Sequence, residues 1–578
     1  MGVAEHAVGP PPTAFPDAPP WRAARRLLAV AVPGGLIATL YVWVGRLGFQ
    51  PTDDGNLLAQ TWRLLHGEVP HRDVIFARPM GSAALHLVDY ALPMPLFESA
   101  RLIGIAEFVA YSLLFAWLVF DRPPSRWGPA RWLAAAASAL VSIHTFPLIG
   151  WYTTDGLLLV AAGFVLLRTG LRDDRLWMRA VGMLLLGCAP LAKQSFFLAP
   201  VLGGVLVATD VRSSGRRLES FIGSGLVAAL PLAAYLGILA IAGGLGDFFS
   251  QIAGAKTVWG TSFVSAFDAG RAALGLSSVA GSTVALLLVR RTVKNAAIDL
   301  AARAGYTAVI VWFLVSGHLA FRGTWALALV WAALLVVLWR AIAERTFDRA
   351  GLIVVAAGWM TALSWGYEVP NLIAGACALY LLDRAWRDVD LRGVRALVAL
   401  GTVVTLAGSS LITAAFAQAR YRHPYGDRPA AELTAPLADV SPEFGSIRTN
   451  PNTASYLSEL ARCVRAHPAS RTAVLPDNPG IYPALELRNP FPIDWMYFAE
   501  IAGHEDRILR ATRRLNERGD YLVLFQTFKL TALQETAPLP KATATSRIHG
   551  GPLMHEIRAR LHGRAVTCGY FVGVYAPG

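Results

Sequence analysis

The chain has 578 residues, of which 54% are hydrophobic and 16% are charged, and it contains 17 Trp. This composition excludes an ordinary soluble globular protein and indicates a polytopic α-helical membrane protein. The formal net charge of +13 does not indicate nucleic-acid binding, because the basic residues lie in short clusters between apolar segments, where the positive-inside rule accounts for them.

The N-terminal segment consists of a tail and a first apolar run. Residues 1–20 are rich in Pro and small residues, which predicts a disordered cytoplasmic tail. The apolar run from Leu27 to about Leu47 follows several arginines and is long enough to span a membrane. No small-residue cleavage site precedes Asp53, so we interpret this run as an uncleaved first helix.

A long polar loop, residues 48–98, follows the first span. It is too polar to cross the membrane and too long for a simple turn, and loops of this kind are usually functional. It opens with the acidic pair Asp53 and Asp54. Two amphipathic stretches, Leu57–Leu65 and Ala83–Leu92, are predicted to be helices that lie along the membrane surface.

Twelve further apolar segments follow, which makes about thirteen transmembrane helices in a domain of residues 21–417. With the N-terminus in the cytoplasm, arginine clusters fall on the cytoplasmic side after every second span, and the opposite loops hold few cations. The predicted plasma-membrane topology places Asp53, Asp54, Lys193 and everything after Phe416 outside the cytoplasm. The predicted segments are 99–120, 131–149, 152–168, 177–192, 195–209, 218–242, 272–289, 304–320, 324–339, 350–365, 370–383 and 396–417.

Residues 418–578 differ in composition and are predicted to form an extracytoplasmic α/β domain. Apolar runs indicate buried strands, and amphipathic patterns beside them indicate helices. Cys463 and Cys568 lie in this domain, where both a disulfide and two unpaired buried thiols stay open. Cys188 and Cys377 lie in apolar spans and are expected to be packing residues. The predicted strands are 471–476, 521–525 and 570–575, and the predicted helices are 453–466, 505–518 and 553–561.

Three acidic residues on the outer face are candidates for catalysis. A carboxylate near an apolar boundary has its charged form disfavoured, and a neighbouring carboxylate raises one pKa further, which suits Asp53 or Asp54 to act as a general base. The alternative is that Asp54 caps a helix beginning at Gly55 while Asp53 is solvated. Asp155 opens the fourth span and could cap it, or hold a sugar hydroxyl or a divalent metal, although no motif specifies metal ligands.

Several cations and polar groups accompany these acids. Lys193 and Gln194 lie at a tight outer junction between two spans, where a cation could bind a lipid phosphate or simply extend to the interface. His71, Arg72 and Arg78 in the first loop bring positive charge near the acidic pair, with surface salt bridges as the alternative. Further candidates at outer turns are His318, Arg322, Tyr367 and Glu368.

The first-loop motif, from Asp53-Asp54-Gly55 through His71-Arg72-Asp73 to Arg78-Pro79, resembles that of GT-C glycosyltransferases. It is most similar to the branch with bacterial aminoarabinose transferases and protein O-mannosyltransferases. Tyr152–Asp155 resembles the second outer acidic loop of this family, and Leu191–Gln194 resembles its Lys-Gln turn. Val474–Asp477 and Gly569–Tyr575 are similar to its outer C-terminal domain.

The resemblance implies transfer of a sugar, usually with inversion, from a polyprenyl-phosphate carrier to a cell-envelope glycan, lipid or protein outside the cytoplasm. Asp53 would be the base, Asp54 and Asp155 would position donor or acceptor, and Lys193 would hold the carrier phosphate. Asp54 stands where the family often has Glu, which leaves open which Asp acts, and His71 replaces a Tyr. A divalent metal stays open as a cofactor.

Two other classes compete with an enzyme. A lipid or polysaccharide flippase would carry functional charges near the bilayer midplane and broken helices in repeated halves. Apart from Glu107, the spans hold few such charges, and no internal repeat is evident. A non-catalytic assembly partner with a receptor-like outer domain also stays open.

Overall fold

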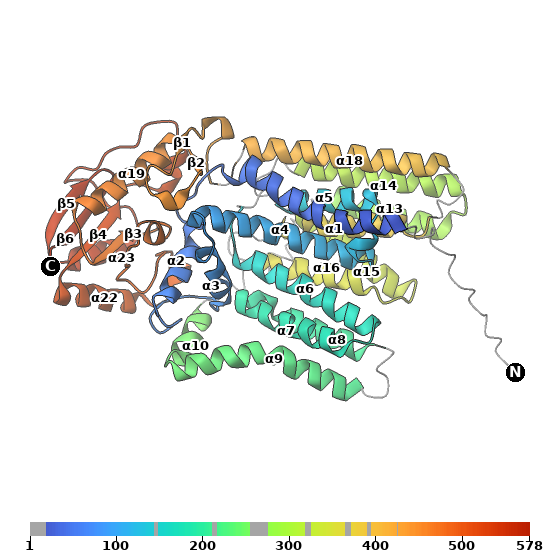
Figure 1. Ribbon diagram of the computed structural model, residues 1–578, viewed down its shortest axis with the longest axis horizontal. Helices are drawn as coiled ribbons and strands as arrows, with labels where there is room; N and C mark the ends of the chain where they lie inside the picture. The colour runs from blue at the N-terminus through green and yellow to red at the C-terminus, as the bar shows by residue number, and fades with distance from the viewer. Residues whose placement is uncertain are drawn as a thin grey trace.

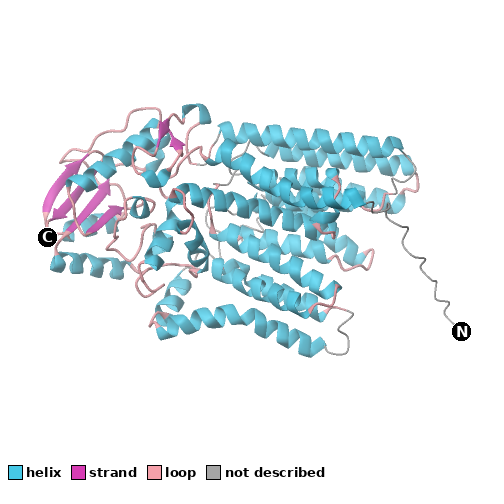
Figure 2. Cartoon of the chain, in the orientation of Figure 1, coloured by secondary structure: helices cyan, strands magenta, loops and turns pink. Residues whose placement is uncertain are grey.

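The computed structural model shows a bundle of helices with an α/β region at one end (Figures 1 and 2). α1 begins at the end of the bundle farthest from that region (Figure 1). Most of the predicted tail, as well as His318, Arg322, Tyr367 and Glu368, lies outside the described residues. These are 19–143, 148–210, 217–254, 276–317, 325–363, 371–389, 395–422, 424 and 426–578.

Each predicted span corresponds to a helix in the described part of the chain. Six helical segments, such as Leu96–Phe120 and Leu218–Ile241, are long and apolar enough to cross a membrane by themselves, and shorter apolar helices pack among them. The chain is therefore a multi-pass membrane protein. The helices are α1 (Pro19–Leu40), α4 (Leu96–Phe120), α5 (Pro129–Ile143), α6 (Tyr152–Arg172), α7 (Leu176–Ala192), α8 (Leu198–Ala208), α9 (Arg217–Ile241), α13 (Gly281–Thr292), α14 (Ala296–Gly317), α15 (Trp325–Ile342), α16 (Arg349–Ala362), α17 (Ala374–Trp386) and α18 (Arg395–Arg422).

Arginine ion pairs gather at the end of the bundle away from the α/β region. Arg168 on α6 pairs with Asp121 after α4 at 2.9 Å. Arg384 on α17 and Arg340 on α15 both reach Asp348, at 2.7 and 2.8 Å. The cation clusters that the sequence assigns to one side of the membrane therefore meet at one end of the fold, as the alternation of charge predicts.

Short helices fill the opposite end, between the bundle and the α/β region (Figure 1). The first loop forms α2 (Asp53–Leu65), α3 (Gly81–Leu85) and the 3-10 helix η2 (His86–Tyr90). Both predicted amphipathic stretches are thus helical. α10 (Leu245–Gly254) was not predicted, and it buries Phe248 and Gln251.

The C-terminal region is built on a four-stranded sheet in the order β3-β4-β6-β5. β3 and β4 are parallel, and the other two pairings are antiparallel, so the last strand, β6, lies inside the sheet. The three predicted strands are confirmed as β3 (Arg471–Leu475), β4 (Tyr521–Gln526) and β6 (Phe571–Ala576). The predicted helices are confirmed as α19 (Pro451–Ala466), α22 (Glu505–Arg518) and α23 (Pro552–Arg560).

The edge strand β5 (Arg564–Cys568) escaped prediction because it is largely exposed and lacks an apolar run. A second, two-stranded sheet pairs β1 (Ala435–Pro436) with β2 (Arg448–Thr449). Cys463 on α19 and Cys568 on β5 form a disulfide with a Cα–Cα distance of 5.8 Å. This decides between the two alternatives for these cysteines and fastens the edge strand to the helix.

Candidate functional site

The acidic pair lies in the first turn of α2, where negative charge favours the helix dipole. The side chain of Gln50 caps the helix, because its Oε1 accepts hydrogen bonds from the backbone N–H groups of Thr52 and Asp53 at 2.6 Å. The helix therefore begins at Asp53, two residues earlier than the capping alternative requires. Capping by Gln50 leaves both carboxylates for other contacts.

Asp54 is buried in an ion pair with Arg101 on α4. Oδ1 of Asp54 accepts from Nη2 of Arg101 at 2.6 Å and from Nε at 3.0 Å. Oδ2 accepts from the backbone N–H of Gln50 at 2.7 Å. Arg101 also donates to the carbonyl oxygens of Gly45 and Gly48, so it joins the first span, α2 and α4. Burial raises the pKa of Asp54, and the charge of Arg101 opposes that rise.

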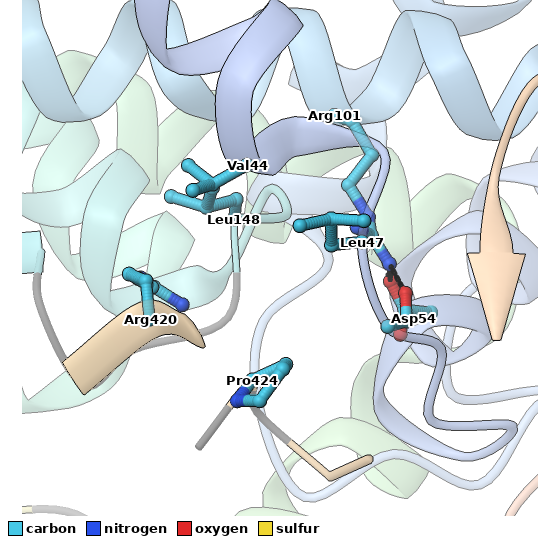
Figure 3. A pocket seen from close by; sticks show the side chains of 8 residues that line it. Val44, Leu47, Asp54, Arg101, Leu148, Arg420 and Pro424 are labelled. Atoms are coloured by element: carbon cyan, nitrogen blue, oxygen red, sulfur yellow. Dashed lines mark hydrogen bonds and ion pairs between the residues drawn. The ribbon is translucent and has the colours of Figure 1, made fainter. Parts of the chain in front are cut away.

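A pocket adjoins this ion pair (Figure 3). It holds about 360 Å³ of empty space, part of it open to solvent. Arg101 from α4 and Arg420 from α18 contribute guanidinium groups, and Asp54 contributes a carboxylate. Apolar side chains near the ends of the spans complete the walls, so the pocket has both a cationic side and an apolar side. The lining residues are Val44, Leu47, Gly48, Asp54, Arg101, Leu148, Arg420 and Pro424.

Asp53 is only partly buried, and its charge acts on Asp477 in the C-terminal region. The start of α2 lies so close to the loop after β3 that a Cβ on Gly55 would come within 2.1 Å of the Cα of Gly480. In that loop, burial and the charge of Asp53 together raise the pKa of Asp477 to about 7. A second carboxyl group, which sequence reasoning did not select, therefore stands beside the predicted base.

The first-loop cations have separate environments. Arg78 is buried, pairs with Glu500 at 2.7 Å and lies 4.9 Å above the ring of Tyr152. His71 is also buried and contacts the side chains of Gln251 and Tyr235, and burial lowers its pKa to about 4. The surface-salt-bridge alternative is wrong for both of these residues.

Arg72 is the exposed member of the three, and its exposed side chain pairs with Asp73 at 2.8 Å. It also donates to the carbonyl oxygen of Ala242, after α9. For Arg72 the surface ion pair that the sequence left open is therefore what the structure shows.

Lys193 and Gln194 do not line the pocket beside Asp54. Lys193 is buried at the end of α7, and its Nζ donates to Oγ1 of Thr153 at 3.2 Å. Nε2 of Gln194 donates to the carbonyl oxygen of Ala77 at 2.9 Å. Because Lys193 is buried, its side chain does not extend to the membrane interface, and that alternative is wrong. The cation in contact with Asp54 is Arg101, and the pocket is lined by neither Lys193 nor Gln194.

Asp155 joins a second acidic group. Its Oδ1 lies 3.2 Å from Nε2 of His86, and Glu107 of α4 approaches the same nitrogen at 3.9 Å. Glu107 stood out in the sequence as a charge within a span, but nothing local linked it to residues 86 and 155. Asp155 therefore does not share the surroundings of Asp54.

α2 is clamped to the C-terminal region. Arg63 on the last turn of α2 bonds to Asp494 at 2.6 and 2.8 Å and to the carbonyl oxygen of Phe491 at 2.7 Å. Trp62 donates its indole N–H to the carbonyl oxygen of Leu487. These contacts fix the first loop between the bundle and the sheet, and so they fix where Asp53 and Asp54 lie.

The fold and its polar layer define a multi-pass helical membrane protein with an α/β region packed on one end of the bundle. No protein-family model and no curated protein matches the chain. Among solved structures, it is similar to the crystal structure of ArnT from Cupriavidus metallidurans in the apo state, with 11% sequence identity and a TM-score of 0.46. The similarity covers 96% of this chain and 98% of that chain. At this identity and TM-score it identifies no site residue.

Proposed function

We propose that the protein is a membrane glycosyltransferase that moves a sugar from a polyprenyl-phosphate carrier to an acceptor outside the cytoplasm. The observation that carries this proposal is the position of Asp53 and Asp54, at the start of α2 between the ends of the spans and the C-terminal region. A carrier of this kind keeps its chain in the bilayer and its phosphate at the interface. The reacting groups must therefore lie at that boundary.

The pocket beside Asp54 has the chemistry that the donor requires. Guanidinium groups bind phosphate with paired hydrogen bonds, and Arg101 and Arg420 both line this pocket. Val44, Leu47 and Leu148 give it an apolar side that suits the first isoprene units. We therefore assign the carrier phosphate to the two arginines, in place of Lys193.

Asp53 is the proposed general base. Its carboxylate takes the proton of the acceptor hydroxyl as that oxygen bonds to C1 of the sugar, and the bond from C1 to the phosphate oxygen breaks. The charge that develops on the leaving phosphate is stabilised by the arginines. Attack opposite to the leaving group inverts C1.

Asp54 is the proposed positioning residue, because both of its oxygens are already bonded and its partner Arg101 faces the pocket. Lys193, Gln194 and Arg78 form a neighbouring layer, in which Lys193 and Arg78 are buried, and we assign this layer to orienting the substrates. The C-terminal region, clamped to α2 by Arg63, covers the acceptor side. Glycan, lipid and protein acceptors of the cell envelope all suit this arrangement.

The test compares matched variants of the full chain in membranes. Polyprenyl-phosphate sugars carrying ¹⁴C-labelled hexose or pentose are supplied one at a time, and transfer to envelope acceptors is measured. Asp53→Asn is expected to lower transfer by about 10²–10⁴-fold, the usual contribution of a general base. Asp439→Asn, at an exposed position in the C-terminal region, serves as the control and should retain activity.

Undiminished transfer in both Asp53→Asn and Asp54→Asn would reject the proposal. Movement of the labelled lipid between leaflets, with no glycosidic product in the wild type, would instead identify a transporter. The same membranes serve both measurements, so the two functions are separated in one preparation.

A further inference from the structure

A buried cluster of one imidazole and three carboxylates lies where η2, α4 and α6 meet. It comprises His86 and Asp89 on η2, Glu107 on α4 and Asp155 in the first turn of α6. One ligand atom each from His86, Glu107 and Asp155 lies within 4.8 Å of the other two. Three separate elements therefore aim oxygen and nitrogen atoms at one point.

The orientation of His86 is fixed from its far side. Nδ1 lies 2.9 Å from Oδ2 of Asp89, and since a carboxylate only accepts, Nδ1 carries a hydrogen. Gly150 packs against the ring so closely that a Cβ there would lie 2.0 Å from Cε1 of His86. Nε2 consequently points at Asp155 and Glu107. A histidine held by a carboxylate behind it is the usual arrangement of a metal ligand.

The cluster has unsatisfied oxygen atoms. Among the described residues, Oδ2 of Asp155, Oε2 of Glu107 and Oδ1 of Asp89 are buried without a hydrogen-bond partner. Such atoms normally cost stability unless an ion or a water satisfies them. They are a second observation, independent of the spacing, that the cluster holds a ligand.

The cluster gathers three carboxyl groups around one imidazole. Oxygen atoms of Asp155 and Glu107 both approach Nε2 of His86, and an oxygen of Asp89 approaches Nδ1. A divalent ion between these atoms would hold the carboxylate oxygens together and would take Nε2 as its nitrogen ligand.

We propose that His86, Glu107 and Asp155 bind a divalent transition-metal ion, with Asp89 orienting His86. One nitrogen and two carboxylates suit Zn²⁺ or Mn²⁺ better than Mg²⁺ or Ca²⁺, which prefer oxygen ligands. Atoms that surround Zn²⁺ at about 2.1 Å in a tetrahedron lie about 3.4 Å apart. The separations of 3.2 and 3.9 Å around Nε2 are close to that value.

The site is separate from the proposed base and needs no sugar donor to fill. Its three elements include the helix that carries Arg101 and the helix that begins at Tyr152, so the ion fastens the middle of α4 to the first turn of α6. Three protein ligands leave a coordination position for water or a substrate oxygen. Metal binding and sugar transfer can therefore fail independently.

The test measures binding in the absence of substrate. The full chain, purified in nanodiscs without a polyhistidine tag, is stripped with a chelator and titrated with Zn²⁺ and with Mn²⁺. Bound metal is measured by mass spectrometry, and Mn²⁺ also by electron paramagnetic resonance. We expect one ion per chain, about 100-fold weaker binding in Asp155→Asn and Glu107→Gln, and about 10–100-fold weaker binding in Asp89→Asn.

The matched control is Glu98→Gln, the same substitution on the same helix, whose side chain accepts from Ser446 outside the cluster. It should bind metal as the wild type does. A folded wild type that binds no ion would overturn the proposal, since protons alone would then neutralise the cluster. Unchanged binding in both Asp155→Asn and Glu107→Gln would also overturn it, because the ion would lie elsewhere. The wild-type titration decides even where a variant fails to fold.

Discussion

Asp54 and Asp155 are the same residue type, each buried in the first turn of a helix at the same end of the bundle, yet their surroundings differ. Both oxygens of Asp54 are bonded, one to Arg101 and one to a backbone N–H group. One oxygen of Asp155 faces His86, and the other has no hydrogen-bond partner among the described residues. A buried carboxylate with an arginine partner holds the fold together, whereas one among other carboxylates is available to bind a cation.

Removal of the arginine should give the largest effect on stability. Arg101→Leu leaves Asp54 buried without its counter-charge, and breaking one side of a buried ion pair typically costs about 3–5 kcal/mol. We expect a clear fall in the thermal unfolding temperature in detergent. The double variant Asp54→Asn with Arg101→Leu should regain part of the loss, because no unpaired charge remains. Equal losses in the single and double variants would contradict the ion-pair account.

Asp477 extends the comparison to a carboxyl group that is partly protonated near neutral pH. The pKa of Asp477 is 3.8 in the unfolded chain and about 7 in the folded chain. At a pH between these two values, the folded chain therefore keeps a proton on Asp477 that the unfolded chain has lost. This contribution to stability is full below about pH 4 and is lost as the pH rises to about 7, by up to about 1.4 kcal/mol per pH unit.

Asp477→Asn should remove that loss. Its unfolding temperature relative to the wild type should therefore increase from pH 5 to pH 8. The exposed Asp439→Asn is the control and should follow the wild type. Asp53→Asn should reduce the pH dependence, since the charge of Asp53 helps to raise the pKa of Asp477. Parallel curves for Asp477→Asn and wild type would argue against a raised pKa.

Asp155→Asn should change stability least, within about 1 kcal/mol, when the metal is absent. The substitution removes one of several facing negative charges, so the repulsion that it relieves offsets the contact with His86 that it weakens. Asp54→Asn, in contrast, should destabilise because it leaves buried Arg101 unpaired. Added Zn²⁺ should raise the unfolding temperature of the wild type but not of Asp155→Asn. A large loss of stability in metal-free Asp155→Asn would contradict this contrast, because Asp155 would then stabilise the fold as Asp54 does.

Most of the fold was predictable from the sequence because its signals are local. Apolar runs mark the spans, and the alternation of arginine clusters correctly groups their ends. The apolar runs 471–476 and 521–525 mark two of the strands. β5 was missed since its residues are mainly exposed, and α10 since a single ten-residue amphipathic helix between spans resembles a loop.

The sites were harder to predict because their partners are distant in sequence. Asp53 and Asp54 stand out as an adjacent pair, but Arg101 lies inside an apolar span among many arginines. His86, Glu107 and Asp155 come from three elements and share no spacing motif. Lys193 drew attention because it lies at a tight junction between two spans, although its contact is Thr153 and not the acidic pair. Helix packing decides which charged side chains come into contact, and no local sequence pattern predicts that packing.

The interior position of β6 has a consequence for biosynthesis. This strand ends at Ala576 and pairs with β4 on one side and β5 on the other. The sheet therefore cannot close until residues 571–576 have left the ribosome, after the helices of the bundle have been made. A nonsense codon at position 571 would remove β6 from the interior of the sheet, and an affinity tag inserted directly after Ala576 needs a flexible spacer.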